Sequence, residues 1–318
     1  MSASESVHDL VVRRRDQLAQ DVVRLTLACP DGGEVPLWEP GAHIDLVLGD
    51  GLVRQYSLCG DVGDRAGLQV AVLREQAGRG GSVHVHDRLA EGDRVQVRGP
   101  RNNFSLVDSP EYLFIAGGIG ITPLMPMIRR AEAVGAEWTL LYGGRTRSSM
   151  AFLDELAGER ADRVRIQPQD EFGLLDLESV LGEPRDGVAV YCCGPEPLLE
   201  AVEKLTAPWP QGSLHLERFS PKTLQDAPEP KAFVVKLART GTEAIVPADR
   251  SIADVLGEAG VDLPTSCLEG TCGTCETAVL EGRPDHRDSL LSEEERRQGK
   301  TMMPCVSRCL SPTLVLDL

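Results

Sequence analysis

Five cysteines near the C-terminus place the strongest constraint on how this chain can fold. Four of its nine cysteines are scattered: Cys29, Cys59, Cys192 and Cys193. The other five lie close together: Cys267, Cys272, Cys275, Cys305 and Cys309. The first three of these have the spacing C-x4-C-x2-C, and Cys305 follows after 29 intervening residues. Three thiolates from one tight loop and a fourth from a distant segment are the ligand pattern of a plant-type [2Fe-2S] cluster.

Two alternatives to this ligand set are open. A structural zinc site would use the same thiolates, although zinc modules usually supply their ligands as two closely spaced pairs. Cys309 is a rival for the fourth position, but the 29-residue gap before Cys305 and the VSR that follows it resemble plant-type ferredoxins. Gly270 and Gly273 lack a Cβ, so the loop backbone can approach a cluster closely and aim N–H groups at its sulfides.

The charge balance argues against several classes of partner. The chain has 33 basic and 49 acidic residues, a net charge of -16 and only 4% aromatic residues. Such a chain offers neither the positive surface nor the stacking platforms that bind nucleic acid, and nothing that would attract an anionic membrane. Residues 1–10 lack the features of a secretory signal. The longest uncharged stretch, 112–128, is interrupted by glycine and proline and is too short to span a bilayer. We therefore expect a cytoplasmic protein with reduced thiols.

The length and spacing of the apolar runs divide the chain into three predicted domains and a linker. Residues 1–105 hold many short strands separated by turn signals, which favours an antiparallel β-barrel. Residues 106–222 alternate strands with helices and predict a parallel α/β domain. Residues 223–230 are rich in proline and polar residues, as linkers are. Residues 231–318 predict a small α+β, β-grasp-like unit that contains the cysteine loop.

Two motifs in the predicted barrel indicate a flavin mononucleotide site. In the run RQYSL, Arg54 and Tyr56 would share one face of a strand and offer a cation and a flat ring. The later GRGGS precedes a predicted helix, where backbone N–H groups can cradle a phosphate. Taken alone, each motif has a plain alternative, an ordinary exposed strand or a flexible turn. Together they select seven candidate flavin-binding residues: Arg54, Gln55, Tyr56, Ser57, Gly80, Gly81 and Ser82.

Two turns in the predicted α/β domain indicate a nicotinamide dinucleotide site. GGIGITP follows a strand and opens a helix, with Thr122 as the predicted N-cap and Pro123 at the first helical position, N1. It lacks the third glycine of the G-x-G-x-x-G fingerprint, which disfavours an ordinary Rossmann dehydrogenase. YCCGP ends another strand and brings Cys193 to the ligand-binding edge, whereas Cys192 can be a small buried hydrophobe. The candidate nicotinamide-binding residues are Gly117, Gly118, Gly120, Thr122, Arg145, Cys193, Gly194 and Pro195.

These motifs carry a resemblance to a known superfamily. The R-x-Y-S run resembles the ferredoxin-NADP reductase superfamily, GRGGS resembles its FMN-binding branch, and GGIGITP and CGP look like its pyridine-nucleotide half. The segment ERF resembles the one whose aromatic residue covers the flavin, although Phe219 could instead pack at a domain interface. Within this resemblance four residues are assigned to catalysis: Ser57, Thr122, Cys193 and Phe219.

The order of flavin barrel, nicotinamide domain and C-terminal ferredoxin resembles the phthalate dioxygenase reductase and vanillate demethylase reductase family over nearly the whole chain. The resemblance implies FMN rather than FAD, and transfer of electrons from NADH through FMN and a [2Fe-2S] cluster to a separate Rieske-type oxygenase. NADPH is an alternative, since Arg145 and Arg147 could bind its 2'-phosphate. A cytochrome P450 is an alternative acceptor, and an iron-sulfur redox sensor is an alternative of another class. We expect a monomer.

Overall fold

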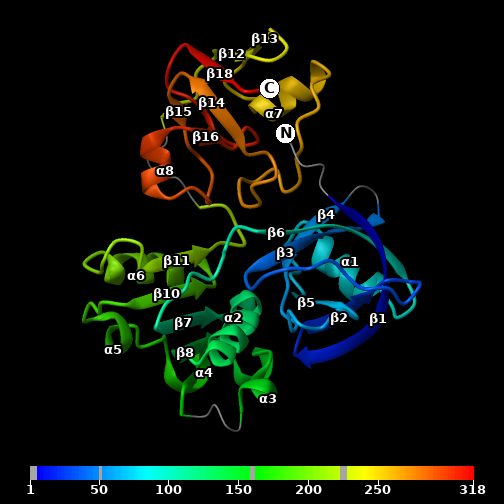
Figure 1. Ribbon diagram of the computed structural model, residues 1–318, viewed down its shortest axis with the longest axis vertical. Helices are drawn as coiled ribbons and strands as arrows, with labels where there is room; N and C mark the ends of the chain where they lie inside the picture. Colours follow the sequence, from blue (N-terminus) through cyan, green and yellow to red (C-terminus); the bar gives the residue numbers. More distant parts are fainter. Residues whose placement is uncertain (1–5, 50–51, 158–161, 223–227) are drawn as a thin grey trace. The chain divides into compact units, whose positions relative to one another are not determined.

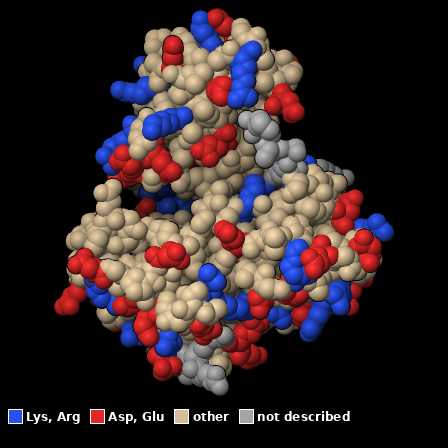
Figure 2. Space-filling model, in the orientation of Figure 1, with Lys and Arg blue, Asp and Glu red and all other residues tan. Residues whose placement is uncertain are grey.

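The computed structural model describes residues 6–49, 52–157, 162–222 and 228–318. The chain forms two compact units, Met1–Glu217 and Arg218–Leu318. Most of the predicted linker, residues 223–227, lies outside the described residues. Among the described residues, no helix is long and apolar enough to cross a membrane. On the face shown in Figure 2, the described acidic and basic side chains are interspersed over the surface.

The first sheet of unit 1 is antiparallel and curls into a barrel (Figure 1, blue to cyan). Its strand order is β4-β3-β6-β1-β2-β5, and a bridge between Leu58 and Val70 joins its two ends. The strands are β1 (Val7–Ala19), β2 (Val22–Ala28), β3 (Ala42–Val47), β4 (Val53–Ser57), β5 (Leu68–Leu73) and β6 (Arg94–Asn102). Alternation sets the two faces: in β2, Val23, Leu25 and Leu27 enter the barrel core. Helix α1 (Gly81–Arg88) follows β5.

The second sheet of unit 1 is parallel, with the order β11-β10-β7-β8-β9 (Figure 1, green). Its strands are β7 (Glu111–Gly117), β8 (Glu137–Gly144), β9 (Val164–Pro168), β10 (Val188–Cys193) and β11 (Leu214–Glu217). The longer helices are α2 (Ile121–Val134) and α6 (Glu196–Thr206). The short ones are η2 (Gly118–Gly120), η3 (Arg147–Ser149), α3 (Leu153–Leu156), α4 (Gln169–Phe172) and α5 (Glu178–Leu181). The strand order reverses between β7 and β10, and such a switch point is where α/β sheets bind ligands.

The two sheets of unit 1 share a hydrophobic core. Val22, Cys59 and Phe104, from the barrel half of the unit, pack in one cluster with side chains of α2 and of the parallel sheet. The buried Tyr191 ring lies 5.4 Å from the Phe104 ring. Because this apolar surface is buried between the sheets, separating them would expose it to water. The barrel and the parallel sheet therefore hold each other in place within the unit.

Unit 2 is built on a five-stranded mixed sheet with the order β13-β12-β18-β14-β16 (Figure 1, yellow to red). Its elements are β12 (Phe233–Leu237), β13 (Glu243–Val246), α7 (Ile252–Glu258), β14 (Thr277–Glu281), β15 (Pro284–Asp285), α8 (Glu293–Gln298), β16 (Thr301–Met302), β17 (Arg308–Cys309) and β18 (Thr313–Leu316). The guanidinium of Arg308 is buried and donates to the carbonyls of Lys231, Pro247 and Arg250. It ties the start and the end of the β12–β13 hairpin to the turn that opens α7.

Candidate functional site

Arg54 and the GRGGS turn form one cradle. The Arg54 guanidinium donates to the carbonyl of Arg79 at 2.6 Å, so the side chain lies over the turn. A Cβ on Gly81 would lie 2.2 Å from Cγ of Arg54, which explains why glycine occupies this position. Gly80 has a φ of 81° and precedes the helix without a side-chain cap, which leaves the first N–H groups of α1 for an anion. These residues fit the phosphate of a flavin mononucleotide.

The other predicted flavin residues divide between two faces of β4. Tyr56 pairs with Ile44 and is packed against the barrel core, and its burial raises the pKa of the phenol. Gln55 and Ser57 point to the opposite face, since neighbouring side chains in a strand alternate. The hydroxyl of Ser82 accepts a hydrogen bond from the Glu75 backbone N–H at 3.0 Å and so closes the loop before α1.

The N-cap prediction for Thr122 is wrong. Helix α2 begins at Ile121, and its N-cap is Gly120, because η2 runs directly into the helix. Thr122 is 2% exposed, and its hydroxyl donates back to the carbonyl of Ile119 at 3.0 Å. The prediction of Pro123 at N1 is wrong for the same reason: Pro123 is the third residue of the helix, still within the first turn, where a missing N–H costs no intrahelical bond.

The two glycine turns meet at the switch point of the parallel sheet. A Cβ on Gly120 would lie 2.2 Å from the carbonyl oxygen of Cys193, and one on Gly117 would lie 2.6 Å from Pro195. A Cβ on Gly194 would lie 3.0 Å from the Gly117 backbone. Gly118 differs, because its φ of 56° is left-handed and open space surrounds it. Three of the glycines therefore let the turns approach one another, and Gly118 leaves the surface of the turn open.

Ser57, Cys193 and Glu217 come together where the barrel meets the parallel sheet. Glu217 ends β11 directly beside Cys193 at the end of β10. Its carboxyl oxygen accepts a hydrogen bond from the Ser57 hydroxyl at 3.3 Å and a weak one from the Cys193 thiol at 3.9 Å. Burial raises the pKa of Glu217 to about 8, and the two hydrogen bonds offset this only in part. The pKa of Cys193 is raised as well, chiefly by burial. At neutral pH the Glu217 carboxyl can therefore keep its proton.

Sequence reasoning missed Glu217 as a site residue. It singled out the segment ERF for Phe219, which lies at the start of unit 2 and is 43% exposed. The signal that could have found Glu217 is its place at the carboxyl end of a strand in the same parallel sheet as Cys193. Cys192 points to the other face of that sheet, where it packs as a small apolar side chain.

The basic residues after β8 differ in their surroundings. Arg147 is paired with Glu171 through two hydrogen bonds of 2.9 and 2.7 Å. Arg145 is exposed and makes no ion pair within the described part of the chain. Both lie at the same edge of the sheet as the glycine turns, because they follow the carboxyl end of a parallel strand.

The four predicted cluster ligands lie as two pairs of sulfur atoms. Cys275 and Cys305 have their Sγ atoms 3.3 Å apart, and Cys267 shares a hydrogen bond with Cys272. The Glu269 N–H donates to Sγ of Cys267 at 3.3 Å. Within the described ranges no three or more His, Cys, Asp or Glu side chains converge on a single ion. Two thiolate pairs with N–H groups aimed at sulfur suit a cluster of two irons.

The loop around these cysteines depends on unusual backbone geometry. Leu268, Gly270 and Gly273 all have left-handed φ values, of 56°, 70° and 72°. A Cβ on Gly270 would lie 2.6 Å from Val306 and 2.9 Å from the backbone of Asp288, so only glycine lets the loop pack here. The Cys309 thiol interacts instead with Ser311 and with backbone carbonyls.

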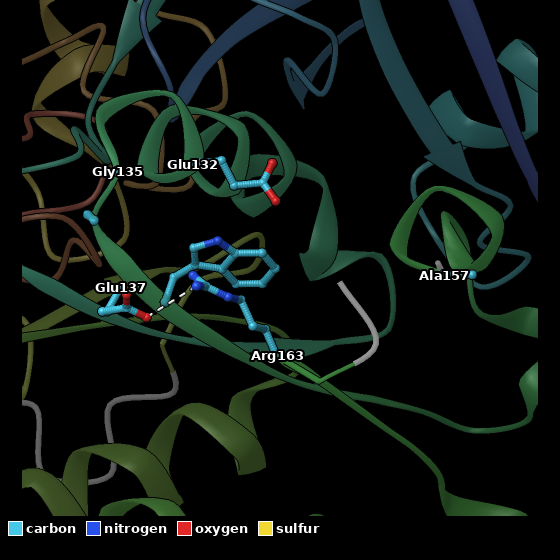
Figure 3. A pocket seen from close by; sticks show the side chains of 7 residues that line it. Glu132, Gly135, Glu137, Ala157 and Arg163 are labelled. Carbon is cyan, nitrogen blue, oxygen red and sulfur yellow. Dashed lines mark ion pairs between the residues drawn. The ribbon is translucent and has the colours of Figure 1, made fainter. Parts of the chain in front are cut away.

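A pocket of about 600 Å³ lies at the end of the parallel sheet where its strands begin, opposite the glycine turns (Figure 3). Its lining residues come from the end of α2 and the turn after it, the start of β8, the residue that follows α3 and the residue before β9, and Glu137 pairs with Arg163 there at 3.3 Å. The Arg163 guanidinium lies 5.8 Å from the centre of the Trp138 ring. None of the predicted cofactor residues lines this pocket.

Two protein families match parts of the chain. A family described as a 2Fe-2S iron-sulfur cluster binding domain matches residues 235–310, and one described as an oxidoreductase NAD-binding domain matches residues 114–204. Among curated proteins, phenoxybenzoate dioxygenase subunit beta of Ectopseudomonas oleovorans is 45% identical over 94% of both chains. Phthalate dioxygenase reductase of Burkholderia cepacia is 40% identical over 97% of both chains.

Solved structures resemble the chain along nearly its full length. The structure of phthalate dioxygenase reductase is 39% identical, with a TM-score of 0.73 and 98% coverage of both chains. An intact type IV self-sufficient cytochrome P450 monooxygenase is 44% identical, with a TM-score of 0.92. That match covers 98% of this chain and 41% of the monooxygenase, so the chain spans less than half the length of that protein.

Proposed function

The chain belongs to the phthalate dioxygenase reductase family, and from this premise we propose that it delivers electrons from NADH to a separate Rieske-type oxygenase. The same membership confirms the predicted fold class, the oxidoreductase activity and the cofactors FMN, [2Fe-2S] and NADH. The observation that carries the proposal is the pairing of two kinds of site on one chain: the group at Ser57, Cys193 and Glu217, and the four paired cysteine thiols.

A bound flavin would supply the conversion between the two-electron hydride chemistry of a nicotinamide and the one-electron chemistry of an iron-sulfur cluster. The chain's own residues position and protect this chemistry. Arg54 and the first turn of α1 hold the phosphate, and the glycine turns after β7 and β10 present backbone N–H groups to the pyrophosphate. Glu217 keeps a proton near neutral pH and anchors the hydroxyl of Ser57 beside Cys193. Cys267, Cys272, Cys275 and Cys305 hold the cluster.

A cytochrome P450 is the second candidate acceptor. The monooxygenase whose reductase part resembles this chain supports it, because that structure is a P450 in which the corresponding region is one part of a longer chain. The curated relatives that name a dioxygenase system and match over nearly their whole length support a Rieske partner. We further propose a monomeric cytoplasmic protein, since nine cysteines without a disulfide bond suit a reducing compartment.

The test compares acceptors and truncations. The full chain with NADH should reduce ferricyanide and a purified Rieske oxygenase, and should reduce a P450 more slowly. A chain ended between residues 220 and 230 should keep the ferricyanide activity, because unit 1 has its own core, and should lose reduction of the protein acceptor. Faster reduction of the P450 would favour the second candidate. Reduction of the oxygenase by the truncated chain would show that the cysteine cluster is not the exit for electrons. Binding of all cofactors without sustained NADH oxidation would instead favour the redox sensor.

A further inference from the structure

Arg129 connects the two halves of unit 1. It lies on α2, the helix that begins at the glycine turn. One guanidinium nitrogen, Nη1, donates to the carbonyls of Cys59 and Gly60 at 2.9 and 2.8 Å. The other, Nη2, donates to a carboxyl oxygen of Glu155 at 2.8 Å. The side chain is 27% exposed. One arginine therefore joins the segment that follows the flavin strand β4 to a helix of the parallel-sheet half.

Glu155 carries this connection back to the barrel. Its second carboxyl oxygen accepts a hydrogen bond from Arg24 of β2 at 2.6 Å, so the carboxylate lies between two arginines. Glu155 belongs to α3, whose N-cap Phe152 is 3% exposed and has a φ of 63°. A buried aromatic residue rarely adopts this left-handed conformation, which persists only where the surrounding structure enforces it. The backbone is thus held in an unfavourable shape at the place that presents Glu155.

The segment that Arg129 binds, Cys59 and Gly60, lies next to the group of Ser57, Cys193 and Glu217. Cys59 follows Ser57 by two residues, and Ser57 donates to Glu217 across the boundary between the two sheets. We propose that Arg129 is a positioning residue, which holds the end of the flavin-binding strand β4 and the glycine turn after β7 at the separation that hydride transfer requires. The inference rests on the proposed function. Reacting atoms must come within roughly 3–3.5 Å, and a misplacement of about 1 Å can cost about a hundredfold in rate.

A purely stabilising role makes a different prediction. The shared hydrophobic core already joins the two halves, and partly exposed ion pairs contribute little to stability. If Arg129 acted only on stability, its loss would lower the melting temperature and leave the rate of flavin reduction unchanged. If it positions the two halves, its loss lowers that rate while NADH and FMN still bind.

The experiment measures reduction of the bound flavin by NADH in an anaerobic stopped flow. Arg129→Ala should lower the limiting rate at least tenfold, with the apparent NADH dissociation constant and the FMN content within twofold of wild type. Arg129→Lys keeps the charge but has a single nitrogen for all three acceptors, so its limiting rate should lie between those of wild type and Arg129→Ala. Arg130→Ala, an exposed neighbour on the same helix, is the matched control and should behave as wild type.

A second readout does not depend on activity. Cys59 and Cys193 are fully buried in the shared core, so loosening its edge should speed their alkylation in Arg129→Ala but not in Arg130→Ala, as followed by peptide mass spectrometry. A limiting rate within twofold of wild type in Arg129→Lys would overturn the inference, even if Arg129→Ala failed to bind FMN. An equal loss of rate in Arg130→Ala would overturn it too. Wild-type protein that did not oxidise NADH at all would refute the proposed function instead.

Discussion

Glu217→Gln should remove a pH dependence of stability that the wild-type protein shows between about pH 4.5 and pH 8. In the folded protein, burial raises the pKa of this carboxyl from an ordinary 4.5 to about 8. Between these values the unfolded chain loses the proton while the folded chain keeps it. The contribution to stability is therefore fully present below pH 4.5, declines as the pH rises, and is lost above about pH 8. Glutamine has no proton to lose, so the variant should lack this decline.

The size of the effect follows from the difference between the two pKa values. A shift of one unit corresponds to about 1.4 kcal/mol, so the full difference gives an upper limit of about 5 kcal/mol. Glu217 is only partly buried as a whole residue, and solvent screening reduces the electrostatic contribution. We expect wild type to lose about 2–3 kcal/mol more than Glu217→Gln between pH 5 and pH 8.5.

Urea unfolding of the flavin-free protein measures this difference directly. All three tryptophans, Trp38, Trp138 and Trp209, belong to unit 1, so their fluorescence reports the unfolding of that unit alone. Glu137→Gln, which removes an exposed carboxylate at the far edge of the parallel sheet, is the control and should follow the wild-type profile. Parallel stability profiles for wild type and Glu217→Gln across this range would refute the reasoning.

Three further changes test other parts of the site. Cys305→Ala should abolish the visible iron-sulfur absorbance and Cys309→Ala should preserve it, because the Cys309 thiol contacts a serine and backbone carbonyls; the opposite pattern would exchange the two assignments. Glu171→Gln should raise kcat/KM for NADPH about tenfold with little change for NADH, because it frees a guanidinium for the 2'-phosphate; no gain would place that phosphate elsewhere. Gly120→Ala should destabilise the protein by more than about 3 kcal/mol in thermal unfolding, because its Cβ would meet a carbonyl oxygen at 2.2 Å. Gly118→Ala, whose Cβ would meet no atom, should cost only about 1 kcal/mol for its left-handed backbone, and equal losses would contradict the packing argument.

Local spacing was enough to predict several parts of this protein. The distances in sequence between Cys267, Cys272 and Cys275 reflect the shape of one loop, Cys305 follows at the spacing typical of a fourth ligand, and the structure gathers the four thiols as two pairs. The glycine turns could be placed at one edge because the carboxyl ends of parallel strands share an edge. These features depend on short-range geometry and on general rules of sheet topology, which a single sequence already contains.

Tertiary structure alone decided the rest. Ser57 and Glu217 are far apart in sequence, and only the packing of the barrel on the parallel sheet brings their side chains together and removes water from the carboxyl. The N-cap of α2 fell on Gly120 because a 3-10 turn feeds directly into the helix, a detail that Thr122 and Pro123 do not reveal. The bridge from Arg129 likewise depends on long-range contacts. Desolvation and hydrogen bonding between distant segments are properties of the packed chain, and no local pattern in the sequence encodes them.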